Sequence, residues 1–215
     1  MMNKILHPPY QLRPATGAQE QRRLQDFIQA AYQRAFDARI PHFLPLLAGL
    51  YRADGELVAA CGLQLAGPAP LYLEQYLDQP AEQILARQRG ISVPRAGLVE
   101  IGNLATSAPG NGRLMFAAVC RQLYRQGQQW VVFTATQPLL NSFHRLHLSP
   151  LELATADPSR VGGDAAHWGR YYQHQPRVMA GELAEGHRIL AGNSLLLSLL
   201  TPGPALFPHA REVRL

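Results

Sequence analysis

The chain has 215 residues, of which 47% are hydrophobic and only 16% are charged, so a sizeable core is possible and disorder is not expected. The net charge of +5 comes almost entirely from arginine, which suits an acidic partner such as a phosphorylated cofactor or an acidic carrier protein, although an arginine-rich genome explains the balance equally. No dense basic stripe with interleaved aromatic residues occurs, so no nucleic-acid partner is expected.

The compartment is predicted from the cysteines and from the apolar runs. Cys61 and Cys120 lie in apolar stretches, as small reduced core residues do. The first ten residues contain no apolar segment typical of an export signal. The longest apolar run, residues 189–200, is shorter than the roughly 20 residues that span a bilayer. We therefore expect a soluble, cytoplasmic protein.

The first ninety residues predict a strand, a helix, a hairpin, a second strand and a short helix, in that order. Their ranges are 10–15, 16–36, 44–66, 71–77 and 81–90. Thr16 and Gln19 have the spacing of a capping box at the start of the first helix. Asp54-Gly55 is a strong hairpin turn.

The rest of the chain alternates strands and helices up to residue 156 and is irregular beyond it. A strand, a glycine-bearing loop, a helix, a strand, a helix and a strand are predicted over 98–105, 106–112, 113–126, 129–136, 137–148 and 150–156. A loop, an aromatic segment, a leucine-rich segment and a Pro-rich tail follow over 157–166, 167–176, 189–200 and 201–215. Antiparallel hairpins combined with one strand–helix–strand unit predict an α+β (mixed α/β) fold rather than a doubly wound sheet.

The loop SAPGNGR (107–113) has the residues of an anion site. Gly110 and Gly112 let a ligand approach the backbone closely, and the free N–H groups of a helix start attract phosphate. Arg113 adds a positive charge at that point. An ordinary strand-to-helix turn uses the same residue types, so the loop alone does not distinguish an anion site from a turn.

Two polar residues, Glu100 and Asn103, interrupt an otherwise apolar strand. A carboxylate in such a strand either pairs with an arginine or has a raised pKa and acts as a base. Strand alternation places Glu100 and Asn103 on opposite faces unless a bulge intervenes.

Other candidate residues are less distinctive. His144 and His147 can share a helix face, but no third ligand is near them in sequence, so no metal site is predicted. Ser107 and Ser142 lack the flanking glycines of a nucleophile elbow. The aromatic segment 167–176 either packs at the edge of a core or lines a substrate pocket.

Four stretches, LYLEQYLDQPAE, VEIGNLA, WVVFTAT with LLNSFHRL, and HWGRYYQHQPRV, together resemble the bacterial thermostable hemolysin family from about Phe27 to Gly186. That family is similar in fold to GNAT-like acyltransferases and acyl-homoserine-lactone synthases. The resemblance implies a central mixed sheet flanked by helices. It implies a GNAT-like domain over 1–186, with a leucine-rich helix and Pro-rich tail (187–215) packed on it or extending from it.

The resemblance also implies an activity. In the acyltransferases a glycine-bearing loop and helix hold the pyrophosphate of acyl-coenzyme A, and LATSAPGNGRLMF is similar to that element. FTATQPLLNSFHRLHLSPLEL is similar to the strand and helix that follow. Because the glycine pattern is only approximated, acyl-CoA and acyl carrier protein are both retained as donors. The expected reaction transfers an acyl group to an amine acceptor, an amino acid or a small amine.

The resemblance implies a role for each candidate residue. The expected catalytic residues are Glu100 as base, with the backbone of Asn103 and Leu104 as an oxyanion hole. The expected donor-binding residues are Ala105, Gly110, Asn111, Gly112, Arg113 and Asn141. The expected acceptor-binding residues are Glu74, Trp168 and Tyr172. For Glu74, an ion pair with an arginine is an equal alternative.

Two other classes of protein remain as alternatives. A membrane-active lytic protein would insert residues 189–200, although this segment lacks the charged face of an interfacial helix. A non-catalytic module that binds acyl chains or a carrier protein would keep the pocket but would not need Glu100. The sequence leaves membrane contact, the oligomeric state and the acyl chain length open.

Overall fold

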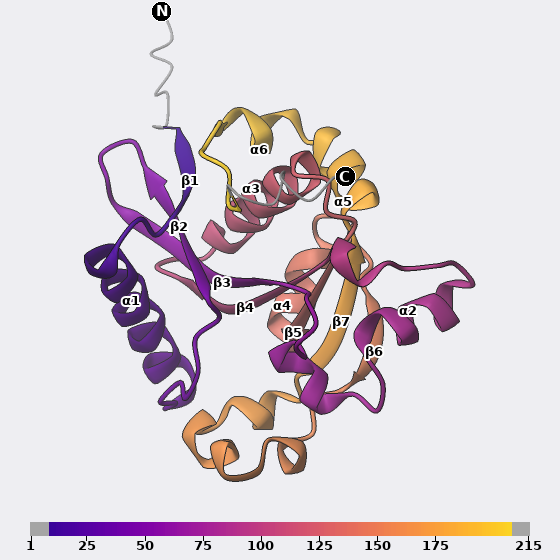
Figure 1. The fold of residues 1–215 in the computed structure, drawn as a ribbon. Coiled ribbons are helices and arrows are strands. Elements are labelled where there is room, and N and C mark those ends of the chain that lie inside the picture. Colours follow the sequence, from indigo (N-terminus) through magenta and orange to yellow (C-terminus); the bar gives the residue numbers. More distant parts are fainter. Residues whose placement is uncertain (1–8, 208–215) are drawn as a thin grey trace, which may run out of the picture.

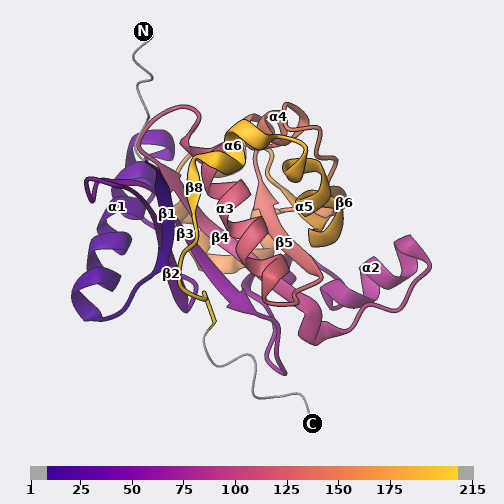
Figure 2. The same cartoon turned by 90° about the horizontal axis from the view of Figure 1, so that it is seen from above.

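One mixed sheet of eight strands crosses the molecule. The computed structural model describes residues 9–207 of the chain. The strand order is β6-β7-β5-β4-β3-β2-β1-β8, and helices cover both faces of the sheet (Figures 1 and 2). The strands are β1 (Tyr10–Pro14), β2 (Leu46–Arg52), β3 (Leu57–Leu65), β4 (Leu98–Thr106), β5 (Trp130–Ala135), β6 (Leu151–Thr155), β7 (Arg177–Glu182) and β8 (Leu200–Thr201).

The pairing of these strands confirms the predicted α+β class. The hairpin of β2 and β3 turns at Asp54-Gly55, where Gly55 has a φ of 85°. Strands β1 to β4 pair antiparallel, whereas β4 and β5 pair in parallel across the helix between them. The sheet is therefore a hairpin half joined to one strand–helix–strand unit.

The helices form two layers. The helices α1 (Ala18–Phe36) and α2 (Ala81–Arg89) pack on one face of the sheet, and α3 (Asn111–Arg125), α4 (Gln137–His144) and α5 (Leu183–Ala191) pack on the other (Figure 2). As predicted, α2 ends at Gly90 in the left-handed conformation. Proline at the first turn of α4 also agrees with the sequence pattern.

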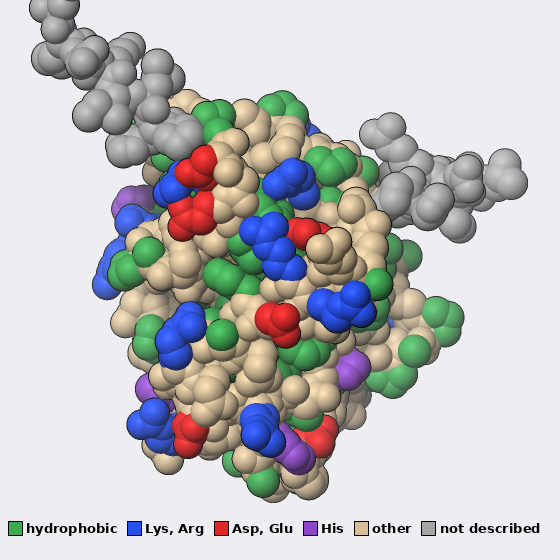
Figure 3. Space-filling view, turned by 90° about the vertical axis from the view of Figure 1, so that its left-hand side faces the viewer, with side chains coloured by type: hydrophobic (Ala, Val, Ile, Leu, Met, Phe, Trp, Pro, Cys, Tyr) green, Lys and Arg blue, Asp and Glu red, His purple; other side chains and the backbone are tan. Residues whose placement is uncertain are grey.

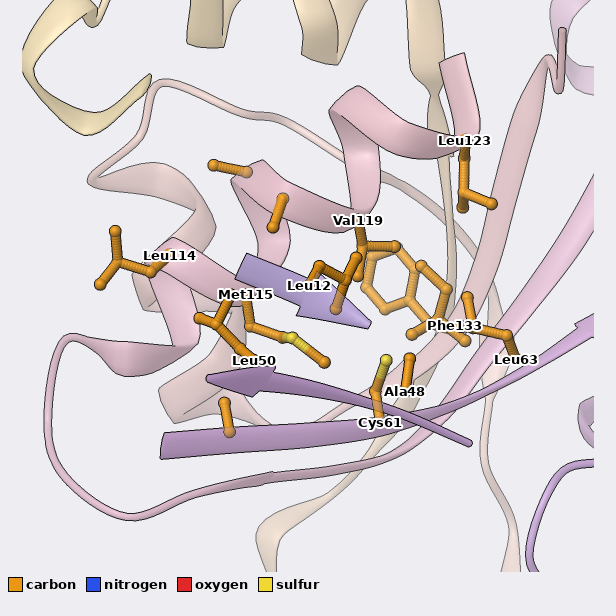
Figure 4. Packing of buried hydrophobic residues seen from close by; sticks show 14 of the residues in the cluster. Leu12, Ala48, Leu50, Cys61, Leu63, Leu114, Met115, Val119, Leu123 and Phe133 are labelled. Carbon is orange, nitrogen blue, oxygen red and sulfur yellow. The ribbon is translucent and has the colours of Figure 1, made fainter. Parts of the chain in front are cut away.

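The largest core lies between the sheet and α3. Leucine, valine and methionine side chains of α3 face the apolar side chains of β1, β2, β3 and β5 (Figure 4). Cys61 is buried in this core, Cys120 is half-buried, and both are free thiols, as predicted. Each fully buried Leu or Met contributes about 1.5 to 3 kcal/mol to folding. This packing holds the start of α3 against the end of β4.

One predicted strand is a helix. Residues 71–77, which alternate like a strand, form the 3-10 helix η1 (Tyr72–Tyr76). The backbone N–H of Leu71 donates to the carboxylate of Glu74, and those of Tyr72 and Leu73 donate to Glu100. These donors bind carboxylates rather than a neighbouring strand, so the tertiary contacts outweigh the alternating pattern.

Strand β7 was not predicted. It lies between β5 and β6 and pairs antiparallel with both. Its sequence, RVMAGE, is short, has a glycine as its second-last residue, and passes directly into α5 without a turn signal. Most of the predicted loop 157–166 forms 3-10 turns (η3, Pro158–Trp168) kinked at Gly162, and η4 (Tyr171–His174) follows within the aromatic segment.

The predicted capping box of the first helix is also wrong. Helix α1 begins after Gly17, and no side chain caps its start. The apolar residues that recur at helical spacing along α1 are buried at Leu24 and Ile28, half-buried at Phe27 and exposed at Ala35. The burial thus comes from two turns in the middle of the helix.

The chain beyond residue 186 returns to the sheet edge. Helix α5 packs against α3, the short α6 (Ser194–Ser198) follows, and β8 pairs in parallel with β1. The guanidinium of Arg121 donates to the carbonyls of Leu200 and Thr201. Within residues 9–207, none of the helices combines the length and apolar character needed to cross a bilayer. The division at residue 186 stays a prediction, and the tail beyond residue 207 lies outside the described residues.

Charges of both signs are mixed on the face that bears α1 and the β1–β2 edge. Arginine and acidic side chains alternate there with apolar and neutral ones (Figure 3). Arg52, for example, pairs with Asp54 and Glu56. This face presents neighbouring ion pairs rather than one continuous basic surface.

A glycine at position 169 is needed where η3 meets α1. Gly169 has a φ of 53°, and a Cβ there would collide with the carbonyl oxygens of Phe36 and Asp37. The N–H of Arg170 donates to the same Phe36 carbonyl at 2.7 Å. We expect Gly169→Ala to lower the free energy of unfolding by about 2 to 4 kcal/mol in urea denaturation. Gly163→Ala is the control, since a Cβ at Gly163 meets no atom within 4 Å; equal losses would contradict the packing argument.

Candidate active site

A bulge interrupts β4 in its middle. Ala60 of β3 pairs with Ala105 and Gly62 pairs with Gly102, so the single residue Cys61 faces two residues of β4, Asn103 and Leu104. Asn103 has a φ of 51°, which is rare for a residue other than glycine. The sequence left open whether Glu100 and Asn103 lie on opposite faces of the strand. With the bulge present, they line the same pocket.

The Asn103 side chain holds the loop that follows α1. Its Oδ1 accepts from the N–H of Leu44 at 2.9 Å, and its Nδ2 donates to the carbonyl of His42 at 3.1 Å. The side chain is only 8% exposed. A Cβ at Gly62 would lie 2.7 Å from Asn103 Oδ1, so the glycine leaves room for this contact. Asn103 and Leu104 are expected to act through their backbone. The bulge removes this backbone from the regular hydrogen-bond ladder between β3 and β4.

Beyond the bulge, β4 and β5 separate. They pair only from Leu98–Ile101 against Trp130–Phe133, after which β4 stays with β3 and β5 stays with β7. A cleft of about 480 Å³ opens between the separating ends. We call it the central cleft; it is lined by Gly102, Leu104 and Thr106 of β4, Phe133 and Thr134 of β5, the start of α3, one side of α4, and Arg145.

The glycine loop lies at the mouth of the central cleft. Helix α3 begins at Asn111, two residues before the predicted start, with Gly110 as its N-cap at a φ of 94° and no side chain capping it. Gly110, Gly112 and Arg113 line the cleft, and Arg145 joins them from the end of α4. Two guanidinium groups and a helix N-terminus thus converge, which favours an anion.

Two of the predicted donor-binding side chains point elsewhere. The Asn111 side chain donates to Val58 O and Ser107 Oγ, which ties the loop to β3. Asn141 accepts from Gln137 on the outer side of α4 and does not line the cleft. Ser142 and Arg145 line the cleft in its place. They lie within about one helical turn of Asn141, so the sequence indicated the correct helix but not the residues that face the cleft. Ala105 lies beside the bulge and packs with α1.

Glu100 is the buried acid of the site. Its side chain is 3% exposed, Oε2 accepts from the N–H of Tyr72 at 2.7 Å, and Oε1 accepts from that of Leu73 at 3.1 Å. Burial raises the pKa of Glu100 to about 8, against the two N–H donors that favour its charged form, and the nearby Glu74 adds to the rise. In the described part of the chain no arginine pairs with Glu100, so of the two alternatives from the sequence the raised pKa applies; the role of Glu100 as a base stays a prediction.

Glu74 forms the arginine ion pair that the sequence left open. Its two carboxylate oxygens accept from Arg95 at 2.8 and 2.9 Å, and the N–H groups of Leu71 and Ala81 donate to it as well. Arg95 also contacts Glu82 at 2.7 Å. This network fixes the start of η1, whose next two N–H groups hold Glu100. The role of Glu74 toward an acceptor stays a prediction.

A small pocket of about 50 Å³ lies over Glu100. We call it the aromatic pocket; the rings that line it belong to Tyr32, His42, Tyr72, Tyr76, Trp168 and Tyr171. The predicted residue Trp168 is therefore in the pocket wall, 7% exposed. Tyr172 lies behind the wall, with its hydroxyl 2.7 Å from that of Tyr76. Sequence reasoning missed Tyr72 and Tyr76 because their segment was interpreted as a strand.

The central cleft connects two other spaces. It shares Gly102, Asn103 and Thr134 with the aromatic pocket. On the other face of the sheet it shares Phe116 and Phe133 with an apolar pocket of about 70 Å³ between α3, α5 and β7. Further apolar side chains line that pocket, namely Val119, Val131, Phe143, Leu148, Leu183 and Leu190. Among residues 9–207, no three His, Cys, Asp or Glu side chains group as metal ligands would.

The sequence matches the thermostable hemolysin family over residues 15–187. No curated protein matches the chain in sequence. Among solved structures, the chain is similar to FeeM, an N-acyl amino acid synthase from uncultured soil microbes, with a TM-score of 0.57 and 15% identity over 83% of this chain and 93% of that one. It is also similar to the CoA-dependent acyl-homoserine lactone synthase BjaI with SAM and isopentyl-CoA, with a TM-score of 0.59 and 12% identity over 94% and 98%.

A third similar structure is the AHL synthase LasI, with a TM-score of 0.50 and 11% identity over 82% of this chain and 90% of that one. At these identities the likeness concerns the fold. The fold is GNAT-like, a mixed sheet flanked by helices, as the sequence resemblance implied.

The buried position of Glu100 predicts a pH dependence of stability. Because its pKa rises from 4.5 in the unfolded chain to about 8 in the fold, the folded protein binds more protons between these values. The free energy of unfolding therefore falls as the pH rises through this interval, by at most about 1.4 kcal/mol per pH unit from this group.

We expect Glu100→Gln to flatten that fall, measured by urea denaturation at a series of pH values. The other ionisable groups around Glu100 are present in both proteins and cancel in the comparison; they are Glu74, His42, Tyr32, Tyr72, Tyr76 and Tyr171. Parallel pH profiles for the two proteins would contradict the burial argument.

Proposed function

Since the chain belongs to the thermostable hemolysin family and has a GNAT-like fold, we propose that it is an acyltransferase that moves an acyl group from a thioester of coenzyme A or an acyl carrier protein to an amine. The observation that carries this proposal is the central cleft, which has a helix start and two arginines in its wall and adjoins the aromatic pocket that contains the buried Glu100. FeeM is an N-acyl amino acid synthase and BjaI is CoA-dependent, which supports both the reaction type and the donor class.

The donor binds through its phosphate groups at the glycine loop. The start of α3 presents its N–H groups beside Gly110 and Gly112, and Arg113 and Arg145 add two positive charges. Coenzyme A and a carrier protein share a phosphopantetheine arm, so this chemistry suits both. The thioester then reaches the bulge, where the backbone near Asn103, Leu104 and Ala105 polarises its carbonyl.

The acyl chain enters the apolar pocket. The rings of Phe116 and Phe133 belong to both the central cleft and this pocket, so a chain attached to the thioester passes between them. Its remaining walls are largely aliphatic, and burying apolar chain there contributes about 0.8 kcal/mol per methylene. The same pocket suits a non-catalytic module that binds acyl chains. Only the enzyme needs Glu100, so this residue distinguishes the two functions.

The chemical step is an aminolysis. Glu100 takes a proton from the ammonium of the acceptor, directly or through water, and leaves a neutral amine. The amine nitrogen attacks the thioester carbon, the carbon–nitrogen bond forms, and the carbon–sulfur bond breaks. The thiolate leaves with a proton from the attacking nitrogen, so the products are an amide and a free thiol. Glu100 returns its proton to solvent.

The test is mass spectrometry of the purified protein with acyl-CoA and acyl-carrier-protein donors of varied chain length and a pool of amines and amino acids. We expect an acyl-amide product whose rate of formation falls by roughly 10² to 10⁴ in Glu100→Gln, while calorimetry shows unchanged donor binding. Glu152→Gln, which removes an exposed carboxylate paired with Arg177, is expected to keep full turnover. Donor binding without product from any combination would support the binding module instead.

The role of the glycine loop in donor binding can be tested separately, at Gly112. A Cβ at Gly112 meets only Thr106 Cγ2, at 3.7 Å, so a side chain fits there without rearrangement. We expect Gly112→Asp to raise the dissociation constant of CoA roughly tenfold or more, because a carboxylate at the helix start repels phosphate. Gly112→Asn, equal in size and neutral, should raise it about threefold at most. Equal affinities of the two variants in calorimetry would remove the loop from the donor site.

A further inference from the structure

The lining of the aromatic pocket indicates the chemical class of the acceptor. This inference rests on the proposed acyltransferase function. The pocket shares Gly102, Asn103 and Thr134 with the central cleft, so a group in it lies next to the thioester position at the bulge. Glu100 also lines it. The acceptor nitrogen therefore belongs in this pocket.

The charges of the wall select a cation. Five Tyr and Trp rings surround the space and Glu100 supplies a carboxyl, while no arginine or lysine is among the described residues that line it. Ring faces and a carboxylate both attract an ammonium group. A carboxylate on the ligand would face Glu100 without a compensating cation, in surroundings that have little water to screen it. The wall thus disfavours an amino acid, whose carboxylate lies one carbon from its nitrogen.

Two polar groups of the wall make no hydrogen bond of normal geometry. In the described part of the chain, these are the Tyr72 hydroxyl and the Trp168 indole N–H, which are both buried and lie near each other. Buried polar groups are almost always hydrogen-bonded, and both residues line the aromatic pocket, so a small movement of either side chain lets it bond to a ligand there. The indole N–H can only donate and the hydroxyl can do both, which suits an uncharged oxygen, above all a hydroxyl.

The size of the pocket limits the ligand. A volume of about 50 Å³ holds on the order of four waters, which corresponds to a molecule of a few heavy atoms or to the head of a longer one. From the cationic preference, the two polar groups and this volume, we infer that the acceptor is a small amino alcohol, with its ammonium at Glu100 and its hydroxyl at Tyr72 and Trp168. The product is then an N-acyl amino alcohol rather than an N-acyl amino acid.

Three small ligands separate the contributions. Ethanolamine has the ammonium and the hydroxyl, propylamine has a methyl group in place of the hydroxyl, and glycine has a carboxylate. Calorimetry on the full chain at about pH 8.5, where Glu100 is mainly ionised and a primary ammonium still protonated, should place ethanolamine first. Propylamine should bind roughly five- to tenfold more weakly, and glycine should bind weakest.

A variant links this order to the wall. Trp168→Phe keeps an aromatic face but removes the N–H, and it is expected to lower the affinity for ethanolamine to about that for propylamine. Its affinity for propylamine should not change, whereas a merely structural role of Trp168 would lower both. Tyr72→Phe, which removes the other polar group, should act in the same direction and serves if the first variant fails to fold.

The outcomes distinguish this inference from the proposed function. Glycine binding more tightly than ethanolamine, no binding of ethanolamine, or equal binding of ethanolamine and propylamine would each overturn the inference. If ethanolamine is preferred but no thioester donor gives an N-acyl product, the proposed acyl transfer fails while the ligand class stands. If glycine is acylated faster than ethanolamine, acyl transfer stands and the amino-alcohol class fails.

Discussion

One extra residue in β4 organises the site. Because Asn103 and Leu104 together face the single Cys61 of β3, the strand leaves its regular path and separates from β5 beyond Ile101 and Phe133. The separation creates the central cleft and brings Glu100 and Asn103 to one pocket. A regular strand would have closed the sheet and placed the two polar side chains on opposite faces. The positive φ of Asn103 is stabilised by the two hydrogen bonds of its side chain to the loop after α1.

The central cleft and the aromatic pocket differ in charge. At the start of α3, Arg113 and Arg145 make one end positive, while the aromatic pocket that adjoins the cleft has aromatic rings and Glu100. In the function that we propose, an anionic donor and a cationic acceptor enter from different sides and meet at the bulge. Such opposed electrostatics also discourage either substrate from occupying the other's site.

The support for Glu100 extends outside the cleft. Arg95 joins Glu74 and Glu82, Glu74 fixes the start of η1, and η1 directs two N–H groups at Glu100. Burying a carboxyl costs free energy, and these donors offset part of that cost. The arrangement holds the carboxylate oxygens in place while desolvation raises the pKa of Glu100 to about 8, which suits the general base that we propose.

The sequence by itself determined the elements with strong local signals and the identity of the central residues. The Asp54-Gly55 hairpin, α2 with its terminal Gly90, and the strand–glycine loop–helix around Gly110 follow from turn chemistry and periodicity, which depend on neighbours along the chain. Only the tertiary structure decided what depends on contacts across the chain. Residues 71–77 became a helix because Glu100, 28 positions after Tyr72, takes its backbone N–H, and β7 became a strand because β5 and β6 flank it. The bulge, the aromatic pocket and the position of Arg145 likewise arise from long-range packing. Hydrophobic periodicity along the chain does not report such contacts.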